Sequence, residues 1–279
     1  MKTIGFIDYF LDEWHANEYP AMIRAYNEKH GTDYQVKYAW AEVDASSGVT
    51  TDDWCEKYGA KRCETIEELC EKCDYVMVLS PSNPEKHYGY AEKVFACGKS
   101  PYIDKTFAPD LFTALSIFGM AKRQGVRCFT SSALRYADEL NAYMGTAKSV
   151  STLGGGSNFE EYIIHQIEMG VKCLGVGAEK LRYYKKDDQE IVEVAYEDGR
   201  TFSMTFAPAL PFAALVVGAD GRTAYSPIQS AFFDNLIADI IRFFETGKPS
   251  FDHEQTLEVM KIRERAIVAK QNYEENAKN

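Results

Sequence analysis

The strongest constraint on the fold is a regular alternation of short apolar strands and helical segments over the first 130 residues. Strand patterns occur at residues 3–7, 34–43, 75–79, 101–103 and 126–130. Helical patterns lie between them, at residues 13–30, 51–58, 66–70, 87–97 and 110–124. Such an alternation is typical of a parallel sheet with helices on its faces, because each parallel strand needs a crossover connection. We therefore expect an α/β fold whose residues 1–130 form a doubly wound domain.

The pattern changes after residue 131, where strand patterns follow one another directly. Asp198-Gly199 and Asp220-Gly221 lie at the turns, and Asp-Gly is a strong hairpin signal. The strands concerned are residues 191–196, 201–206 and 213–217. We expect residues 131–279 to form an α+β domain with a largely antiparallel, open sheet. Its helical patterns lie at residues 158–174, 228–245 and 254–276, and the last helix is expected to pack back on the first domain.

Composition argues against several classes of protein. The 279 residues carry a formal net charge of −11, which repels polyanions and argues against nucleic acid as a partner. No apolar run reaches the roughly 18 residues that span a bilayer, so we expect no membrane partner. The seven cysteines are scattered and odd in number, as in reduced, cytoplasmic proteins. Cys70 and Cys73 form a CxxC, but no second pair completes four ligands, and no metal site is expected.

Two segments carry an ordered set of polar motifs. Within residues 74–108 these are Ser80-Pro81, His87, Gly98-Lys99 and Asp104-Lys105-Thr106. In the second half Glu161 and His165 are four residues apart on a predicted helix, so their side chains share one face. This order resembles the Gfo/Idh/MocA oxidoreductases, which have a Ser/Thr-Pro turn, a helix-opening His, Gly-Lys and Glu-Lys-Pro. Here Asp-Lys-Thr replaces Glu-Lys-Pro, and the turn is slightly longer.

The resemblance implies that residues 1–130 are a Rossmann-like dinucleotide-binding domain for NAD or NADP. It implies that residues 131–279 are a substrate and oligomerisation domain that binds a sugar, cyclitol or related polyol. In such enzymes the lysine and the histidine exchange a proton with the substrate hydroxyl or carbonyl while hydride passes to or from the cofactor. The matching residues here are Lys105 and His165, with Glu161 as the group that orients the imidazole. A neutral imidazole or a lysine of lowered pKa is suited to accept that proton near neutral pH. A homo-oligomer is also implied, because an open sheet needs its exposed face covered.

The resemblance also implies a set of cofactor-binding positions. Glu42 ends the second strand, where an acid hydrogen-bonds the adenosine ribose and favours NAD over NADP; the alternative is an ordinary charge at a strand end. Turn formation and helix capping are the alternatives for the residues around position 80. The remaining predicted positions are Asp8, Tyr9, Trp14, His15, Ser80, Pro81, Asn83, His87 and Asp104.

The turn after the first strand departs from the Rossmann pattern, since the ten residues after Gly5 contain no glycine. Asp8, Asp12 and Glu13 instead place carboxylates about where the phosphates would lie. At an effective dielectric of about 20, two charges ~5 Å apart repel by roughly 3 kcal/mol. Asp12 as an N-cap and Glu13 as a first-turn acid would also explain these residues. Two functions stay open: an NAD-dependent oxidoreductase that holds its cofactor in an altered way, and an inactive family member, a pseudoenzyme, that binds a small ligand or partner without a dinucleotide.

Overall fold

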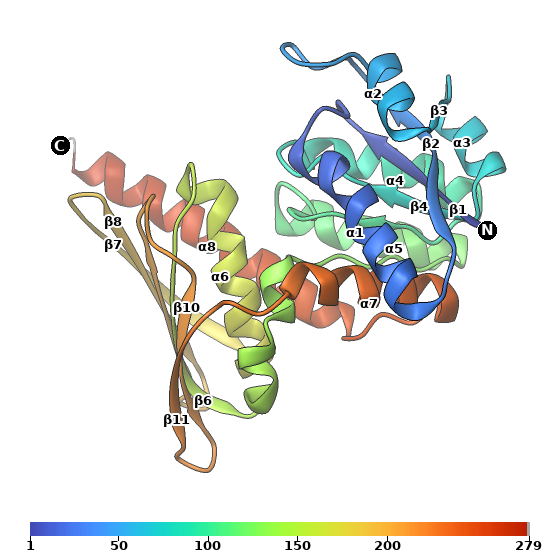
Figure 1. The fold of residues 1–279 in the computed structure, drawn as a ribbon. Helices are drawn as coiled ribbons and strands as arrows, with labels where there is room; N and C mark the ends of the chain where they lie inside the picture. Colours follow the sequence, from blue (N-terminus) through green and yellow to red (C-terminus); the bar gives the residue numbers. More distant parts are fainter. Residues whose placement is uncertain (278–279) are drawn as a thin grey trace. The chain divides into compact units, whose positions relative to one another are not determined.

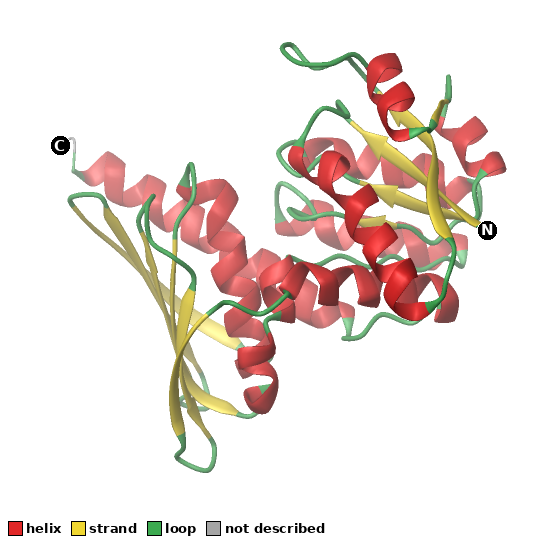
Figure 2. Cartoon of the chain, viewed as in Figure 1, coloured by secondary structure: helices red, strands yellow, loops and turns green. Residues whose placement is uncertain are grey.

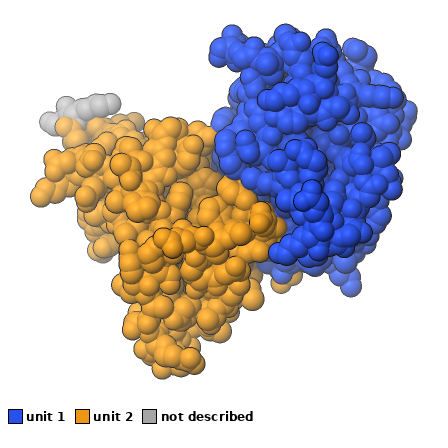
Figure 3. Space-filling model, viewed as in Figure 1, with its two compact units in different colours: residues 1–131, 236–251 blue, residues 132–235, 252–279 orange. Residues whose placement is uncertain are grey.

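The computed structural model describes residues 1–277 (Figure 1). The chain divides into two compact units, which are coloured separately in Figure 3. Unit 1 comprises Met1–Ser131 and Leu236–Phe251, and unit 2 comprises Ser132–Asn235 and the chain from Asp252 on. No helix within residues 1–277 is long and apolar enough to cross a bilayer.

Unit 1 is built on a five-stranded parallel sheet of order β3-β2-β1-β4-β5. The strands are β1 (Lys2–Asp8), β2 (Tyr34–Ala41), β3 (Lys61–Arg62), β4 (Tyr75–Val78) and β5 (Tyr102–Ile103). The order reverses next to β1, which confirms the predicted doubly wound fold. The predicted strand at 126–130 is reduced to a single bridge between Phe129 and Tyr102, because β5 is only two residues long.

Several helices of unit 1 begin or end at residues that bond their exposed backbone groups. They are α1 (Trp14–His30), α2 (Thr51–Tyr58), α3 (Ile66–Lys72), the short η1 (Pro84–Lys86), α4 (His87–Ala96) and α5 (Leu111–Gln124). Thr50, Thr65 and Asp110 cap the starts of α2, α3 and α5, since each side chain accepts a backbone N–H three residues on. Left-handed glycines end α1, α2 and α5. These helices carry the chain back so that β1, β4 and β5 all end at one edge of the sheet.

Unit 2 is built on a six-stranded sheet of order β11-β10-β6-β9-β8-β7. The strands are β6 (Ala147–Gly154), β7 (Ala178–Lys186), β8 (Gln189–Tyr196), β9 (Thr201–Phe206), β10 (Ala213–Gly218) and β11 (Thr223–Pro227). Every neighbouring pair is antiparallel except β6 and β9, and the two Asp-Gly turns join the hairpins that the sequence predicts. Along β8 buried residues alternate with more exposed ones, so one face of the sheet packs on the core.

One face of this second sheet is covered by α6 (Phe159–Leu174) and α8 (His253–Asn276), as Figures 1 and 2 show. Two short helices, η2 (Ala133–Tyr136) and η3 (Asp138–Tyr143), precede β6, and α7 (Phe232–Thr246) follows β11. We expected the last helix to pack on the first domain. Its residues Val259, Ile262 and Ala266 lie in the core of unit 2, and packing of this helix on the first domain stays a prediction. Residues 236–251, which include most of α7, cluster with unit 1.

Candidate functional site

The carboxyl edge of the unit 1 sheet brings together polar residues that follow three different strands. Asp8 ends β1 and is 1% exposed. Its Oδ1 accepts hydrogen bonds from the Tyr9 backbone N–H at 2.7 Å and from Ser80 Oγ at 3.0 Å. Its Oδ2 has no hydrogen-bond partner among residues 1–277. Burial, and then the nearby charge of Glu13, raise the pKa of Asp8 well above its usual range.

The start of α1 is capped by Glu13, which corrects the sequence-based expectation that Asp12 is the N-cap. The Glu13 carboxylate accepts the backbone N–H of His15 at 2.8 Å through Oε2 and that of Ala16 through Oε1. Asp12 instead accepts the backbone N–H of Val49 at 2.9 Å, so its carboxylate is used by the loop before α2. The first free N–H groups of α1, which bind phosphate in a Rossmann site, are therefore bonded to a side chain of the protein.

A second buried acid, Asp104, follows β5 and is fully buried. Its Oδ2 pairs with His15 Nδ1, and its Oδ1 accepts Tyr102 Oη at 3.0 Å and the backbone N–H of Lys105 at 2.8 Å. Burial raises the pKa of Asp104, but the opposing effects of His15 and Lys105 prevail and leave it lowered. The His15 ring stacks on Tyr19 with the centroids 5.1 Å apart. Lys105 is only 7% exposed, so the predicted catalytic lysine is buried close to the end of β5.

Glu42, the predicted ribose ligand, is bonded by two side chains that the sequence did not identify. Lys86 Nζ lies 2.5 Å from Oε1, and Tyr90 Oη donates to Oε2 at 2.6 Å. The hydrogen bonds from Lys86 and Tyr90 lower the pKa of Glu42. The Lys86 ammonium also lies 4.6 Å from the centroid of the Tyr9 ring. Both oxygens of the acid are thus engaged by residues of η1 and α4.

The other predicted cofactor positions are divided between the turn after β4 and the start of α1. Asn83 closes a turn through its N–H bond to Ser80 O at 3.0 Å. Pro81 is buried, and the fully buried His87 contacts the carbonyl oxygens of Leu79 and, at 3.1 Å, Phe107. Burial lowers the pKa of His87. Trp14 is 49% exposed. The turn and its helix thus have structural contacts, and their cofactor contacts stay predictions.

In unit 2, His165 lies on α6 and is held by a serine that the sequence analysis missed. Ser132 Oγ lies 2.6 Å from His165 Nδ1. The Ser132 backbone N–H donates to Glu168 at 3.2 Å, and Glu168 pairs with Arg135 at 3.0 Å. Only the fold brings Ser132 near a histidine 33 residues away, and no spacing rule could identify it. The imidazole is therefore fixed by a buried polar network.

Glu161, the predicted orienting acid, lies in the first turn of α6. Its backbone N–H donates to the N-cap Asn158 at 2.8 Å, and its Oε2 accepts Asn158 Nδ2 at 3.2 Å. This reciprocal bonding stabilises the start of the helix. Its action on His165 stays a prediction, as does the joint action of Lys105 and His165, which belong to different units.

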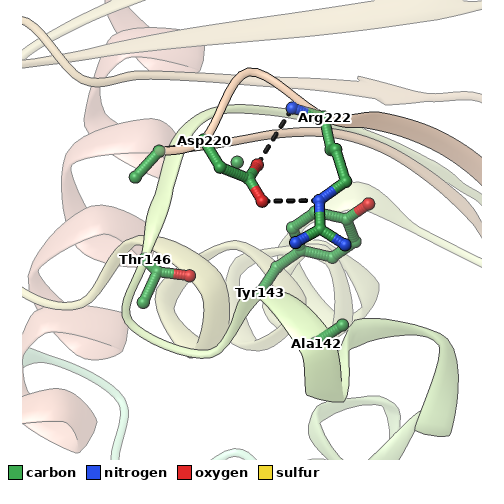
Figure 4. Close-up of a pocket in the computed structure, with 7 residues that line it drawn as sticks. Ala142, Tyr143, Thr146, Asp220 and Arg222 are labelled. Carbon is green, nitrogen blue, oxygen red and sulfur yellow. Dashed lines mark hydrogen bonds and ion pairs between the residues drawn. The ribbon is translucent and has the colours of Figure 1, made fainter.

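Unit 2 also has a separate hollow of about 290 Å³ between η3 and the turn joining β10 and β11 (Figure 4). Asp220 and Arg222 on its rim pair with each other, with Arg222 Nε 2.6 Å from Asp220 Oδ2. Tyr143 lies on the η3 side. None of the predicted site residues lines this hollow. Within residues 1–277, no group of three His, Cys, Asp or Glu is placed to hold a metal ion.

Comparison with known proteins identifies the part of the chain that carries the family pattern. Residues 20–132 match the model of the Gfo/Idh/MocA oxidoreductase family, which is described as having an NAD-binding Rossmann fold. The predicted Gfo/Idh/MocA resemblance is confirmed. NAD, the expected cofactor, agrees with that family description. The Gfo/Idh/MocA segment includes Lys105 but begins at Pro20, after the turn that lacks glycine.

Solved structures share the fold over nearly the whole chain. A UDP-N-acetylglucosamine 3-dehydrogenase, GnnA, from Acidithiobacillus ferrooxidans aligns with a TM-score of 0.72 at 13% identity, covering 96% of this chain and 97% of its own. GenD2 from gentamicin A biosynthesis, solved with NAD, aligns with a TM-score of 0.75 at 15% identity, covering 96% of this chain and 94% of its own. A dehydrogenase (MviM) from Clostridium difficile aligns with a TM-score of 0.73 at 14% identity, covering 96% of this chain and 99% of its own. No curated protein sequence matches this chain. At these identities the Gfo/Idh/MocA structures show a common fold.

Proposed function

We propose that the protein is an oxidoreductase that acts on a CH–OH group of a sugar, cyclitol or related polyol, with NAD as its dinucleotide. The observation that carries this proposal is Lys105, which lies two residues after the end of β5 at the ligand edge of a parallel sheet and inside the Gfo/Idh/MocA segment. GnnA is named as a dehydrogenase of a sugar nucleotide, and GenD2 was solved with NAD, which supports this substrate and cofactor class.

The residues at the pyrophosphate position do not fit a dinucleotide in the usual Rossmann pose. Glu13 already accepts the N–H groups at the start of α1, and Glu42 is bonded to Lys86 and Tyr90. When bound, NAD would accept or supply the hydride. The chain's own residues are responsible only for the proton and for the position of the substrate.

The proton chemistry is proposed for Lys105 and His165. Oxidation of a carbinol needs a base for the hydroxyl proton, and reduction of the carbonyl needs an acid at the same place. Ser132 supports both roles, because a hydroxyl can donate to His165 Nδ1 or accept a hydrogen from it at the same 2.6 Å distance. Both neutral tautomers of the imidazole therefore keep this bond. A carboxylate partner would support only the tautomer that carries its proton on Nδ1.

The test is turnover of a panel of sugars and cyclitols, followed by NADH absorbance, in single variants. Lys105→Ala and His165→Ala are each expected to lower turnover at least about a hundredfold with folding intact. Lys122→Ala, which removes an exposed lysine on α5, serves as the matched control and should keep full activity. Near-normal turnover in either of the first two variants would remove that residue from its proposed role.

A second candidate function is an inactive family member that binds a small ligand or a partner without a dinucleotide. The self-capped start of α1 favours it, because this helix needs no ligand to satisfy its N–H groups. Titration with NADH and NADPH, followed by energy transfer from the tryptophans, separates the two functions. Trp14 lies at the start of α1, next in sequence to Glu13, and is therefore the tryptophan closest in sequence to the expected phosphate position. Absence of binding by both cofactors below millimolar concentration would refute the oxidoreductase.

We also propose a cytoplasmic homo-oligomer in which a second copy covers the open face of the unit 2 sheet. The pairing register places a row of side chains across that sheet: Tyr225, Leu215, Ser151, Ser203, Glu193 and Arg182. Leu215 and Tyr225 are exposed apolar residues in this row. Light scattering should give more than one copy per particle, and Leu215→Glu with Tyr225→Glu should lower that number. A clean monomer at micromolar concentration would refute this arrangement. The seven cysteines, all free thiols, support a reducing compartment.

A further inference from the structure

We propose that Glu13 is an internal anion that occupies the pyrophosphate position at the start of α1, so that a dinucleotide binds tightly only when this carboxylate is displaced. The inference rests on the proposed function, because it takes NAD as the dinucleotide that competes with Glu13. It concerns a residue outside the segment that matches the family model, which begins at Pro20.

The geometry of Glu13 reproduces the contacts that a phosphate makes at a helix start. Phosphate groups bind there because the first N–H groups lack partners within the helix and the helix dipole favours negative charge. Glu13 has an extended backbone, with φ −132° and ψ 167°, and its side chain turns back over the first turn. One oxygen accepts the N–H of His15 at 2.8 Å and the other accepts the N–H of Ala16. Carboxylate and phosphate would therefore use the same donors.

Of the acids near the start of α1, Glu13 is the one whose removal we expect to change dinucleotide affinity most. The first turn of α1 contains no other acidic residue. Two further acids lie close enough to affect Glu13, and they differ in state. Asp104 Oδ2 pairs with His15 Nδ1, and the pKa of Asp104 is lowered despite its burial. Asp8 is buried with one oxygen unpartnered within residues 1–277, and burial favours its neutral form. Burial also raises the pKa of Glu13, but His15 and the two backbone N–H groups oppose that effect. Glu13 thus places a carboxylate in direct contact with the donors that a pyrophosphate needs.

The experiment compares binding of NADH and of ADP, a pyrophosphate fragment, to wild type and variants by titration calorimetry. Glu13→Gln keeps the size of the side chain and removes its charge. Glu13→Ser keeps an N-cap oxygen but is too short to bond both N–H groups. Because serine is a favoured N-cap, this variant should fold even where Glu13→Gln does not. Each is expected to bind NADH and ADP about 10- to 100-fold more tightly than wild type. Glu18→Gln, an exposed acid on the same helix, is the matched control. It removes the same charge without touching the N–H groups and should change affinity less than about threefold.

The possible outcomes separate this inference from the proposed function. Tighter binding of both ligands by Glu13→Gln and Glu13→Ser supports the inference, even when no polyol is oxidised and the oxidoreductase proposal fails. Unchanged affinity in both folded variants overturns it, as does a wild type that already binds NADH as tightly as they do. An equal gain in Glu18→Gln also overturns it, since the effect would then come from net charge alone.

Discussion

The buried ion pair of Arg135 and Glu168, which belongs to the same polar network as His165, gives a prediction whose size can be derived from the structure. Arg135 and Glu168 are 6% and 5% exposed at their side chains, and Arg135 Nη1 lies 3.0 Å from Glu168 Oε2. Glu168→Gln removes the counter-charge of a guanidinium that stays buried. Breaking a buried pair from one side costs about 3 to 5 kcal/mol, against about 1 kcal/mol for a neutral hydrogen bond. Because Gln keeps one acceptor oxygen, we expect the lower end, about 3 kcal/mol.

The loss should be confined to the elements that the pair holds together. Hydrogen exchange followed by mass spectrometry measures opening free energies segment by segment. A loss of 3 kcal/mol corresponds to roughly 100-fold faster exchange in α6, with no change in β1 of unit 1. Glu160→Gln, which removes a more exposed acid from the same helix, is the matched control and should change exchange little.

A double variant tests whether the lost charge partner is the cause. Arg135→Met combined with Glu168→Leu removes both charges and should recover most of the stability lost in Glu168→Gln. A single variant that costs less than about 1 kcal/mol would refute the argument. A double variant no more stable than the single one would show that the loss comes from packing.

Three further predictions concern single positions. The pKa of Asp8 is raised in the folded state, so wild type should lose stability as the pH rises above the usual pKa range of an aspartate, and Asp8→Asn should not. Melting temperatures of the two proteins that run parallel across pH would contradict this. Ser132→Ala should alter the imidazole titration of His165 in NMR spectra, with Ser132→Thr restoring it; identical spectra would remove the serine from its positioning role. Gly170→Ala would place a Cβ 2.2 Å from the Phe202 ring and should cost about 1 to 3 kcal/mol in urea unfolding; an unchanged midpoint would show that the ring can move.

The sequence predicts those parts of the fold that depend on local chemistry. Apolar runs locate β1, β2 and β4, and the Asp-Gly pairs locate two hairpins of unit 2. Asp8, Ser80 and Asp104 could be grouped because residues that follow parallel strands meet at one edge. The place of Val259, Ile262 and Ala266 of α8 in the core of unit 2 could not be predicted in this way. An apolar stripe shows that a helix is buried on one side, but not which core it covers.

The unpredicted parts of the site depend on contacts between distant segments. Asp12 and Glu13 are adjacent acids, and either could cap α1. In the structure Asp12 accepts the backbone N–H of the distant Val49, and Glu13 caps the helix. Lys86 and Tyr90 reach Glu42 from 44 and 48 residues away. A polar side chain gives no sign in the sequence of the partner that it will bond.

The capped start of α1 explains how the glycine-rich turn can be absent while the Rossmann fold persists. The first N–H groups of a helix must find an acceptor, and in a dinucleotide-binding protein the ligand supplies it. Glycines serve that purpose by letting the backbone approach the phosphate. Once Glu13 provides the acceptor, the helix is satisfied without ligand, and the turn is free to hold larger residues such as Tyr9 and Phe10. The fold thus requires an acceptor at this point, and only function requires that the acceptor be a cofactor.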